Sequence, residues 1–228
     1  MKRDLIVVNW KHVKKTMNDH MQDNECVVLA ISGGVDSMVL LEVARSKLDP
    51  NHFAVAHFNH HIRDTDQEEH LVREYCETHN LICHIGHGVD LKGDENQART
   101  QRWAFLEDIA SQYNCNAIVT AHHKNDLIEN FILQIMRGNH ILSCPMQEKI
   151  EKNGFIRLKP FLDITKEELI KHAHYRNVQW FEDETNQNND YTRNLVRNII
   201  IPEMMKDRNV LTSIPKTIQS VLSLKPEK

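Results

Sequence analysis

The chain is poor in cysteine, and no two of its cysteines stand in a CxxC spacing. Five cysteines, an odd number, are spread over 228 residues, which argues against a disulfide framework and against a paired-cysteine zinc site. We therefore expect reduced thiols, with Cys83, Cys115 and Cys144 as inert small hydrophobic residues. No apolar run approaches the width of a bilayer, and residues 1–4 lack the apolar segment of a signal peptide. These absences predict a cytoplasmic protein with no membrane partner.

The chain also lacks the strong positive charge of a dedicated nucleic-acid binder, because its formal net charge is −4. Residues 60–95 hold nine acidic and three basic side chains, whereas residues 131–181 hold five acidic and eight basic ones. A polyanion would prefer the second stretch. Scattered, solvated charge is the alternative interpretation. The candidate phosphate contacts in this stretch are Arg137, Lys149, Lys152, Arg157 and Lys159.

The most informative stretch is Ser32-Gly33-Gly34-Val35-Asp36-Ser37. It follows the apolar run 26–31 and precedes a helical pattern over 38–48, and a strand, a glycine turn and a helix start together make a phosphate cradle. Glycines let backbone N–H groups approach an anion, the two serine hydroxyls add donors, and the helix N-terminus adds partial positive charge. We expect this stretch to bind the phosphates of ATP; an ordinary strand-to-helix turn is the alternative.

The same stretch lacks the lysine of a Walker A loop, since the first lysine after Gly34 is Lys47. That absence argues against a kinase or a motor ATPase. An aspartate in the cradle would repel phosphate unless a divalent cation lay between them, so Asp36 indicates a bridging Mg²⁺. The stretch is similar to the SGGxDS signature of the PP-loop ATP pyrophosphatases, and this resemblance implies that the loop grips the departing pyrophosphate.

Apolar and amphipathic stretches alternate along the first 136 residues. Strands are expected at 26–31, 53–58, 81–86 and 117–121, and helices at 4–17, 66–79, 96–113 and 125–136. This order predicts an α/β fold with a doubly wound parallel sheet. Ligands of such sheets bind beyond the carboxyl ends of the strands, and Ser32, His57 and His122 lie at or directly after these ends.

The periodicity weakens after residue 137. We expect a loop or mobile lid over 138–154, an extended segment over 155–162 and a helix over 165–176. A short strand is expected at 178–181, and a helix from 191 that ends at Pro202. The predicted organisation is one catalytic domain over 1–205 and a short helical appendage over 206–228.

A second group of polar residues follows the strand expected at 117–121. On a helix that begins near Asn125, Asp126 and Glu129 share one face. His122 directly precedes the N-terminal end of this helix. Two carboxylates on one face can grip an ammonium group, hold a metal, or form an exposed acidic turn stabilised by the helix N-terminus. Histidines at 57, 60, 61, 122 and 123 are compatible with zinc, but the HExxH motif is absent and we expect most histidines to be structural.

Together these pieces resemble the catalytic domain of the bacterial tRNA(Ile)-lysidine synthetases, from about residue 27 to residue 202. Each motif is weak alone, but their order and spacing are specific. The further matching pieces are His57-Phe58-Asn59-His60-His61-Ile62-Arg63, Gln97-Ala98-Arg99 with Arg102, Arg137-Gly138, Lys159-Pro160-Phe161-Leu162, Glu182-Asp183-Glu184-Thr185-Asn186, and Arg193-Asn194 with Arg197.

The resemblance implies a two-step reaction on the anticodon stem-loop of an isoleucine tRNA. ATP would adenylate the wobble cytidine, and the ε-amine of free lysine would then displace AMP to form lysidine. Asp126 and Glu129 would bind the lysine ammonium, and His122 is the candidate base. Asp36 with Mg²⁺, and Arg193 or Arg197, would meet the charge at the α-phosphate. The remaining assignments are ATP contacts from residues 32–37, His57 and Asn59, and tRNA contacts from Arg99, Arg102, Arg137 and Lys159.

Members of that family usually carry further C-terminal domains that grip the tRNA, whereas this chain ends at Lys228. Four alternatives follow for the source of tRNA affinity: a short appendage over 201–224, a homodimer, a partner protein, or nothing that replaces those domains. Two alternatives stay open: another PP-loop adenylating enzyme that modifies tRNA, and a non-catalytic relative that binds a nucleotide or tRNA. A tRNA thiolase is disfavoured because thiolases of this fold generally need paired cysteines.

Overall fold

The computed structural model describes residues 13, 15–16, 26–60, 66–91, 95–141, 146–182 and 192–224. The chain divides into two compact units, and each is described by itself. The first unit comprises Met1–Ala121, Glu148–Pro160 and Glu167–Glu182, and the second comprises His122–Gln147, Phe161–Lys166 and Asp183–Lys228.

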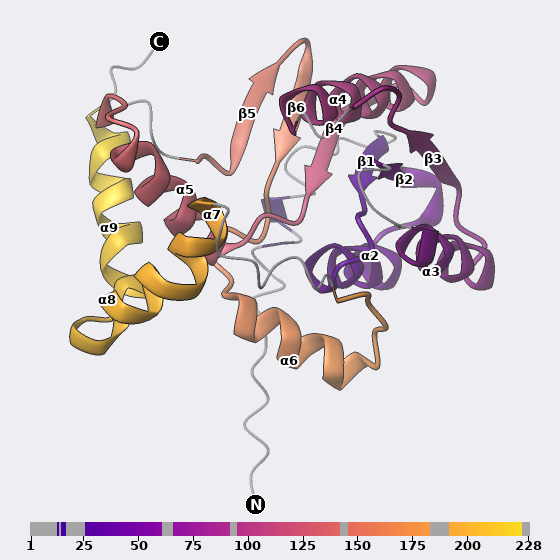
Figure 1. Ribbon diagram of the computed structural model, residues 1–228. Coiled ribbons are helices and arrows are strands. Elements are labelled where there is room, and N and C mark those ends of the chain that lie inside the picture. Colours follow the sequence, from indigo (N-terminus) through magenta and orange to yellow (C-terminus); the bar gives the residue numbers. More distant parts are fainter. Residues whose placement is uncertain are drawn as a thin grey trace, which may run out of the picture. The chain divides into compact units, whose positions relative to one another are not determined.

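The first unit is built on one six-stranded sheet (Figure 1). All neighbouring strands pair in parallel except β5, which is antiparallel to β6. From β1 the chain winds outward through β2 to β3 and then returns to the other side of β1, so the sheet is doubly wound as the sequence predicts. The strand order is β3 (Cys83–His87), β2 (Phe53–Asn59), β1 (Cys26–Ala30), β4 (Cys115–Thr120), β6 (Phe155–Leu158) and β5 (Lys149–Lys152).

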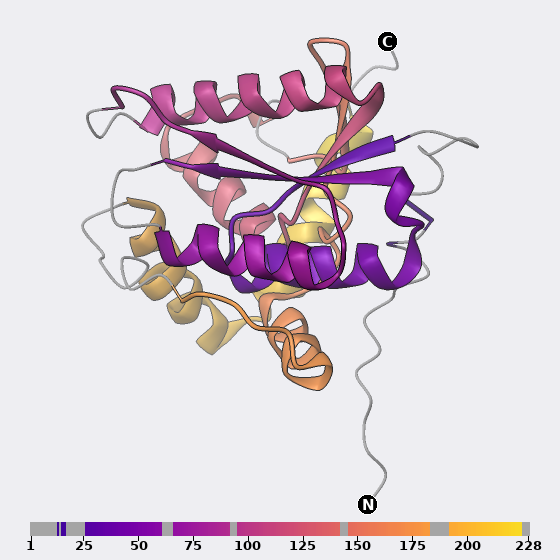
Figure 2. The same cartoon turned by 90° about the vertical axis from the view of Figure 1, so that its right-hand side faces the viewer.

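Helices cover both faces of this sheet. Figure 2 shows α4 (Glu95–Gln112) on one face and α2 (Val35–Lys47) with α3 (Asp66–Thr78) on the other. Strands covered on both faces need apolar sequences: β1 is apolar throughout and β4 is apolar over 117–119. In the core on the α4 side, Leu106 and Ile109 pack with Val28 and Ile118.

A buried glutamate joins three helices of the first unit. Glu42 of α2 accepts hydrogen bonds from the guanidinium groups of Arg176, at 2.6 Å, and Arg45, at 2.7 Å. The hydroxyl of Tyr75, on α3, donates to the same carboxylate at 2.8 Å. Arg176 is the last residue of α6 (Lys166–Arg176), so this carboxylate ties α6 to α2 and α3.

The second unit is helical. Ile218 of α9 packs with Leu127 and Phe131 of α5, and Val196 packs with Ile128 in a neighbouring cluster. The described part of the expected appendage therefore has an apolar face buried within this unit; a domain boundary at residue 205 stays a prediction. The elements are α5 (Lys124–Met136), α7 (Thr192–Leu195), the π-helical stretch η4 (Val196–Ile200), α8 (Ile201–Asp207) and α9 (Val210–Ser223).

Three expectations about the second half of the chain are wrong. Residues 149–152 of the expected loop form β5, which turns into β6 through Asn153 and Gly154, both with positive φ. The strand expected at 178–181 is absent from that described stretch. The helix expected to end at Pro202 continues to Asp207: Pro202 lies in the first turn of α8, which follows the π-helical stretch Val196–Ile200 without a break.

The expectation of reduced thiols is wrong for one pair of cysteines. Cys26 and Cys115 form a disulfide between β1 and β4. The two residues are partners in the parallel register of these strands, a proximity that their separation of 89 residues along the chain conceals. Cys76 and Cys83 are free thiols.

Two further expectations concern the helix over 4–17 and the membrane. Within 4–17 only Val13, Lys15 and Thr16 are described, and all three are helical; the rest of that stretch and Cys144 lie outside the described residues. Among the helices that the structure describes, none combines the length and the apolar character needed to cross a bilayer.

Candidate active site

The loop between β1 and α2 has the geometry of an anion cradle. Gly33 has φ +90°, a conformation that favours glycine. The Ser37 hydroxyl lies beneath the loop: it donates to the Gly34 carbonyl at 2.9 Å, accepts from the Ser32 N–H at 3.1 Å and lies 3.1 Å from the Ser32 hydroxyl. Gly34 is the N-cap of α2 and offers no side-chain cap. The first N–H groups of this helix are thus presented to an anion rather than to a capping side chain.

Two residues that the sequence analysis missed hold this loop in place. A Cβ on Gly33 would lie 3.0 Å from the Cβ of Glu68, a buried residue of α3. The Phe181 N–H donates to the Gly33 carbonyl at 3.0 Å. Glu68 and Phe181 lie far from Gly33 along the chain, so no local pattern could have identified them. They give the loop support from two sides.

Asp36 lies in the first turn of α2 and is half-buried. Among the residues that the structure describes, no three His, Cys, Asp or Glu side chains gather into a metal-binding group. A cation at this place would therefore take one carboxylate from the chain and its other ligands from phosphates and water, which is how Mg²⁺ is commonly held. Asp36 and the open helix start fit that arrangement.

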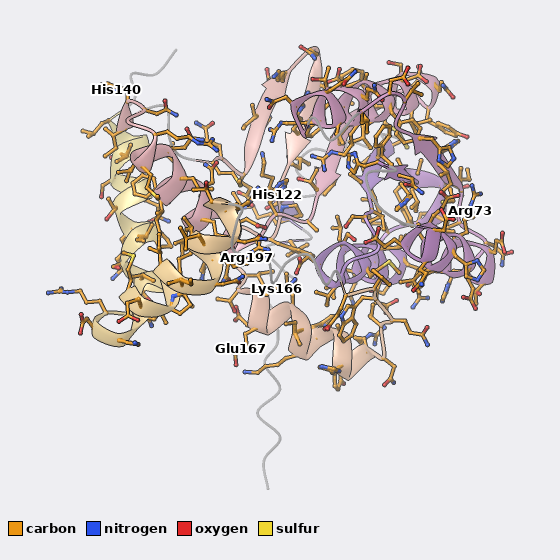
Figure 3. All side chains as sticks on the ribbon, in the orientation of Figure 1. Arg73, His122, His140, Lys166, Glu167 and Arg197 are labelled. Carbon is orange, nitrogen blue, oxygen red and sulfur yellow. A yellow bond between two sulfur atoms is a disulfide. The ribbon has the colours of Figure 1, made fainter. Side chains whose placement is uncertain are left out.

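His57 and Asn59 lie near the end of β2, next to β1. The Nδ1 atom of His57 is 2.9 Å from the Ile31 carbonyl, and its Nε2 atom has no hydrogen-bond partner in the described part of the chain. Burial lowers the pKa of His57, an effect that the Ile31 hydrogen bond only partly opposes, so the ring is neutral at pH 7. Asn59 donates to Glu69 of α3 at 3.1 Å. Glu69 is also paired with Arg73, which Figure 3 labels on α3.

A pocket of ≈ 720 Å³ lies on the α3 side of the first unit. Its walls include Asp66, Glu69 and Glu74 of α3 on one side and Trp180 with Phe181 on the other. Because the Phe181 N–H is bonded to Gly33, one wall of the pocket is attached directly to the anion cradle.

The basic residues of the first unit differ in accessibility. Arg157 is buried, pairs with Glu107 at 2.6 Å and lies 3.5 Å above the ring of Trp103. It is therefore part of the packing between β6 and α4, and we withdraw it as a candidate phosphate contact. Lys159 is also buried, and burial, followed by the charges of Arg157 and Arg99, lowers its pKa to about 8.

Arg99, on α4, is exposed, and Arg102 is half-buried. Lys159 follows β6 at the carboxyl edge of the sheet. Arg137 is the C-cap of α5 in the second unit and is exposed. Three of the four expected tRNA contacts, Arg99, Arg102 and Lys159, are thus in the first unit.

In the second unit, Asp126 belongs to the first turn of α5. Its Oδ2 atom accepts the N–H of His123, the N-cap residue, at 3.1 Å. Burial on its own raises the pKa of Asp126, but the charges of His123 and His122, the His123 hydrogen bond and Arg193 outweigh that effect and leave the pKa below its usual value. Asp126 is therefore ionised at pH 7. His122 precedes the helix and is half-buried; Figure 3 labels it.

Glu129 lies one turn further along α5 and carries the best-defined ion pair of this unit. Arg197 donates to its two oxygens through Nε at 2.7 Å and through a terminal nitrogen at 2.9 Å. Arg193 donates to it through Nε at 3.3 Å. Both arginines also approach Asp126 Oδ1 at 3.5 Å. The structure thus unites the expected residues Asp126, Glu129, Arg193 and Arg197 in one cluster of two negative and two positive charges.

Comparison with known proteins agrees with this architecture. The sequence profile of the PP-loop domain matches residues 7–204. A bifunctional TilS/HprT protein of Listeria innocua is 34% identical over 209 residues, which are 86% of this chain and 32% of the relative. A tRNA(Ile)-lysidine synthase of Aster yellows witches'-broom phytoplasma is 35% identical over 206 residues, 89% of this chain and 47% of the relative. The chain thus spans about a third to a half of the length of these relatives.

Solved structures show the same fold. The U34-tRNA thiolase NcsA of Methanococcus maripaludis superposes with a TM-score of 0.76, over 96% of this chain and 80% of that protein. The two sequences are only 16% identical, so the likeness is one of fold. It confirms the α/β architecture that the strand and helix order predicts.

Proposed function

The chain belongs to the family of PP-loop domains, and on that premise we propose that it is an ATP-dependent ligase that converts the wobble cytidine of an isoleucine tRNA into lysidine. The observation that carries the proposal is the pairing of two features in one chain. The first unit has a glycine-bent anion cradle with an aspartate in it, and the second has a buried Glu129 that holds Arg193 and Arg197. Two relatives of this chain are named tRNA(Ile)-lysidine synthase, which supports the proposal.

In the first step, the C2 oxygen of cytidine attacks the α-phosphorus of ATP. A bond forms between that oxygen and phosphorus, the bond to the bridging oxygen of the β-phosphate breaks, and pyrophosphate leaves. Residues 32–37 hold the departing phosphates through N–H groups and hydroxyls, and His57 and Asn59 contact the nucleotide. Arg193 and Arg197 stabilise the charge that develops at the α-phosphate.

Asp36, together with the phosphates of ATP, would hold a Mg²⁺ ion, and that ion would supply electrostatic stabilisation of the leaving pyrophosphate. Support for this role comes from the position of Asp36 in the first turn of α2 and from the open helix start beside it. Without the metal, the carboxylate would repel the nucleotide, so Asp36 and the cation are expected to act together.

In the second step, the ε-amine of free lysine attacks C2 of the adenylated cytidine. A carbon–nitrogen bond forms, the bond from C2 to the AMP oxygen breaks, and AMP leaves. The ammonium of lysine must first lose a proton, and His122, which precedes α5, is the candidate base. The sequence assigns the selection of an ammonium group over a neutral side chain jointly to the negative charges of Asp126 and Glu129.

Binding of the tRNA anticodon stem-loop falls to the basic residues. Arg99, Arg102 and Lys159 in the first unit and Arg137 in the second are the proposed phosphate contacts. The reaction requires tRNA and free lysine, and we place it in the cytoplasm. A homodimer would add phosphate contacts from a second copy.

The test is a reaction with purified protein, ATP, Mg²⁺, lysine and an isoleucine tRNA transcript. We expect AMP and pyrophosphate in equal amounts, with turnover only when tRNA and lysine are both present. Asp36→Asn should abolish turnover, whereas Glu151→Gln, an exposed residue of β5, should leave it unchanged. Turnover that requires tRNA but not lysine would support another PP-loop adenylating enzyme that modifies tRNA, and ATP or tRNA binding without turnover would support a non-catalytic relative.

A further inference from the structure

Glu129 lies where a substrate amine cannot reach it. Its side chain is 1% exposed, and each of its oxygens accepts an N–H of Arg197, at 2.7 and 2.9 Å. This fork arrangement matches the planar guanidinium to the planar carboxylate. A lysine ammonium could bind Glu129 only by displacing Arg197 and giving up two charge-assisted hydrogen bonds.

The two arginines, by contrast, are accessible from solvent. The side chain of Arg193 is 49% exposed and that of Arg197 is 35% exposed. A guanidinium presents five N–H donors in a fixed plane, so one edge can hold a carboxylate while another faces a second anion. In this cluster the carboxylate of Glu129 is therefore buried, whereas the two guanidinium groups are exposed.

The helix that carries the arginines is irregular in a way that supports this orientation. Pro202 has no N–H, and in η4 the Ile201 N–H donates to the Val196 carbonyl, five residues earlier. Such π-helical turns occur often at functional sites. Arg193 precedes this turn and Arg197 lies in it (Figure 3 labels Arg197). Hydrogen bonds to Glu129 hold both side chains.

Asp126 has a different environment. One of its oxygens caps α5 through the His123 N–H, and the other is 3.5 Å from each arginine, near the limit of a hydrogen bond. Its side chain is 13% exposed, against 1% for Glu129. Asp126 is thus the more accessible of the two acids in this cluster and the less tightly held by the arginines.

We propose that Glu129 is a positioning residue, which fixes Arg193 and Arg197 to bind a phosphoryl oxyanion, and that Asp126 alone receives the ammonium group of the incoming amino acid. This inference rests on the proposed function and divides two roles that the sequence assigned jointly to Asp126 and Glu129. Glu129 acts on the adenylation step through the arginines, and Asp126 acts on the binding of lysine.

The kinetic test compares Glu129→Gln with Asp126→Asn in two assays. Formation of adenylated tRNA without lysine is measured in a single turnover, and the KM for lysine is measured in the full reaction. We expect Glu129→Gln to slow adenylation about 100-fold and to change the lysine KM by less than about 2-fold. Asp126→Asn should raise the lysine KM roughly 10-fold or more, with a smaller effect on adenylation. A raised lysine KM and unchanged adenylation in Glu129→Gln would overturn the inference.

Glu129→Asp keeps the charge and serves as the conservative variant, and it replaces Glu129→Gln if the latter does not fold. We expect it to recover part of the adenylation rate, because a carboxylate can still hold one arginine. Arg197→Lys is measured beside it. If Glu129→Asp has native circular dichroism but adenylates as slowly as Glu129→Gln, while Arg197→Lys adenylates fast, a role of Glu129 through the arginines is contradicted.

An NMR titration separates this inference from the proposed function. Arginine Nε–H resonances of the full chain are followed while inorganic pyrophosphate is added. We expect the signals of Arg193 and Arg197 to shift in the wild type and in Asp126→Asn, and to lose that response in Glu129→Gln. If the wild-type protein fails to adenylate tRNA, the proposed function fails while these shifts still decide the inference. Absence of shifts in the wild type, or equal shifts in Glu129→Gln, overturns it.

Discussion

Replacement of Glu42 by glutamine should destabilise the first unit more than any exposed charge substitution. The carboxylate is buried and accepts hydrogen bonds from Arg176, Arg45 and Tyr75. Glutamine has nearly the same shape, but its amide group would direct N–H donors at an arginine. Hydrogen bonds to a charged group contribute about 1.5–3 kcal/mol, and loss of one partner of a buried ion pair costs about 3–5 kcal/mol.

The two arginines reduce this cost because they are partly exposed, at 32% for Arg45 and 41% for Arg176. Water can hydrate them after the substitution, so we expect a loss of about 2–3 kcal/mol in the free energy of unfolding. That is a large share of the 5–15 kcal/mol typical of a domain. Urea unfolding at pH 7, followed by circular dichroism and by tryptophan fluorescence, measures it.

The matched control is Glu151→Gln, which removes an exposed carboxylate of the same unit and should change stability by less than about 0.5 kcal/mol. A difference of less than about 1 kcal/mol between Glu42→Gln and this control would refute the view that the Glu42 carboxylate holds α2, α3 and α6 together.

The pH dependence of this difference follows from the direction of the pKa shift. Burial by itself raises the pKa of Glu42, but hydrogen bonds from Arg176, Arg45 and Tyr75 outweigh it, and the pKa lies below the ordinary 4.5. The ionised form is therefore favoured in the folded state, and the stabilisation is fully present above pH 4.5. It is lost as the pH falls through the lowered pKa. The gap between wild type and Glu42→Gln should shrink on acidification.

Three further outcomes are expected. Gly33→Ala should abolish ATP binding in calorimetry while the fold persists, because φ is +90° and the new Cβ would lie 3.0 Å from the Glu68 Cβ; retained affinity would contradict the cradle geometry. The affinity for tRNA should fall as the pH rises through about 8, where Lys159 loses its charge, and Lys159→Arg should remove that fall in a filter-binding titration. Cys26→Ser should lower stability by about 3 kcal/mol under oxidising conditions and abolish the effect of added reductant on the unfolding midpoint.

Much of the first unit could be predicted from the sequence because its signals are local. The parallel strands are short apolar runs, and the cradle is a contiguous motif between a strand and a helix. β5 escaped prediction because all four residues of Lys149–Lys152 are exposed and show no alternation. The prediction at Pro202 was wrong because proline usually ends a helix, whereas here a π-helical turn directly precedes it and the helical run continues as α8.

The residues of the candidate site were easier to predict than their surroundings. The expected Asp126, Glu129, Arg193 and Arg197 do form one cluster. Helical spacing puts the two acids on one face of α5, but it cannot reveal that arginines more than 60 residues away bind both oxygens of the buried Glu129 and only approach Asp126. Burial of a side chain depends on contacts between distant segments, and a single sequence does not display those contacts.

The supports of the anion cradle were missed for the same reason. Glu68 lies under Gly33, and Phe181 binds its carbonyl, yet neither belongs to the motif that identifies the loop. The pairing of Cys26 with Cys115 likewise depends on the register of two strands. A contiguous motif can identify a binding loop, whereas the residues that stiffen it become apparent only in the folded chain.

The identity of the wobble nucleoside after the reaction tests the central claim most directly. Isoleucine tRNA is incubated with the protein, ATP, Mg²⁺ and isotopically labelled lysine, then digested to nucleosides and analysed by mass spectrometry. We predict that the wobble cytidine gains one lysyl group carrying the label, and that Asp36→Asn leaves it unmodified. An unmodified cytidine in the presence of folded, ATP-binding wild-type protein would contradict the proposed function.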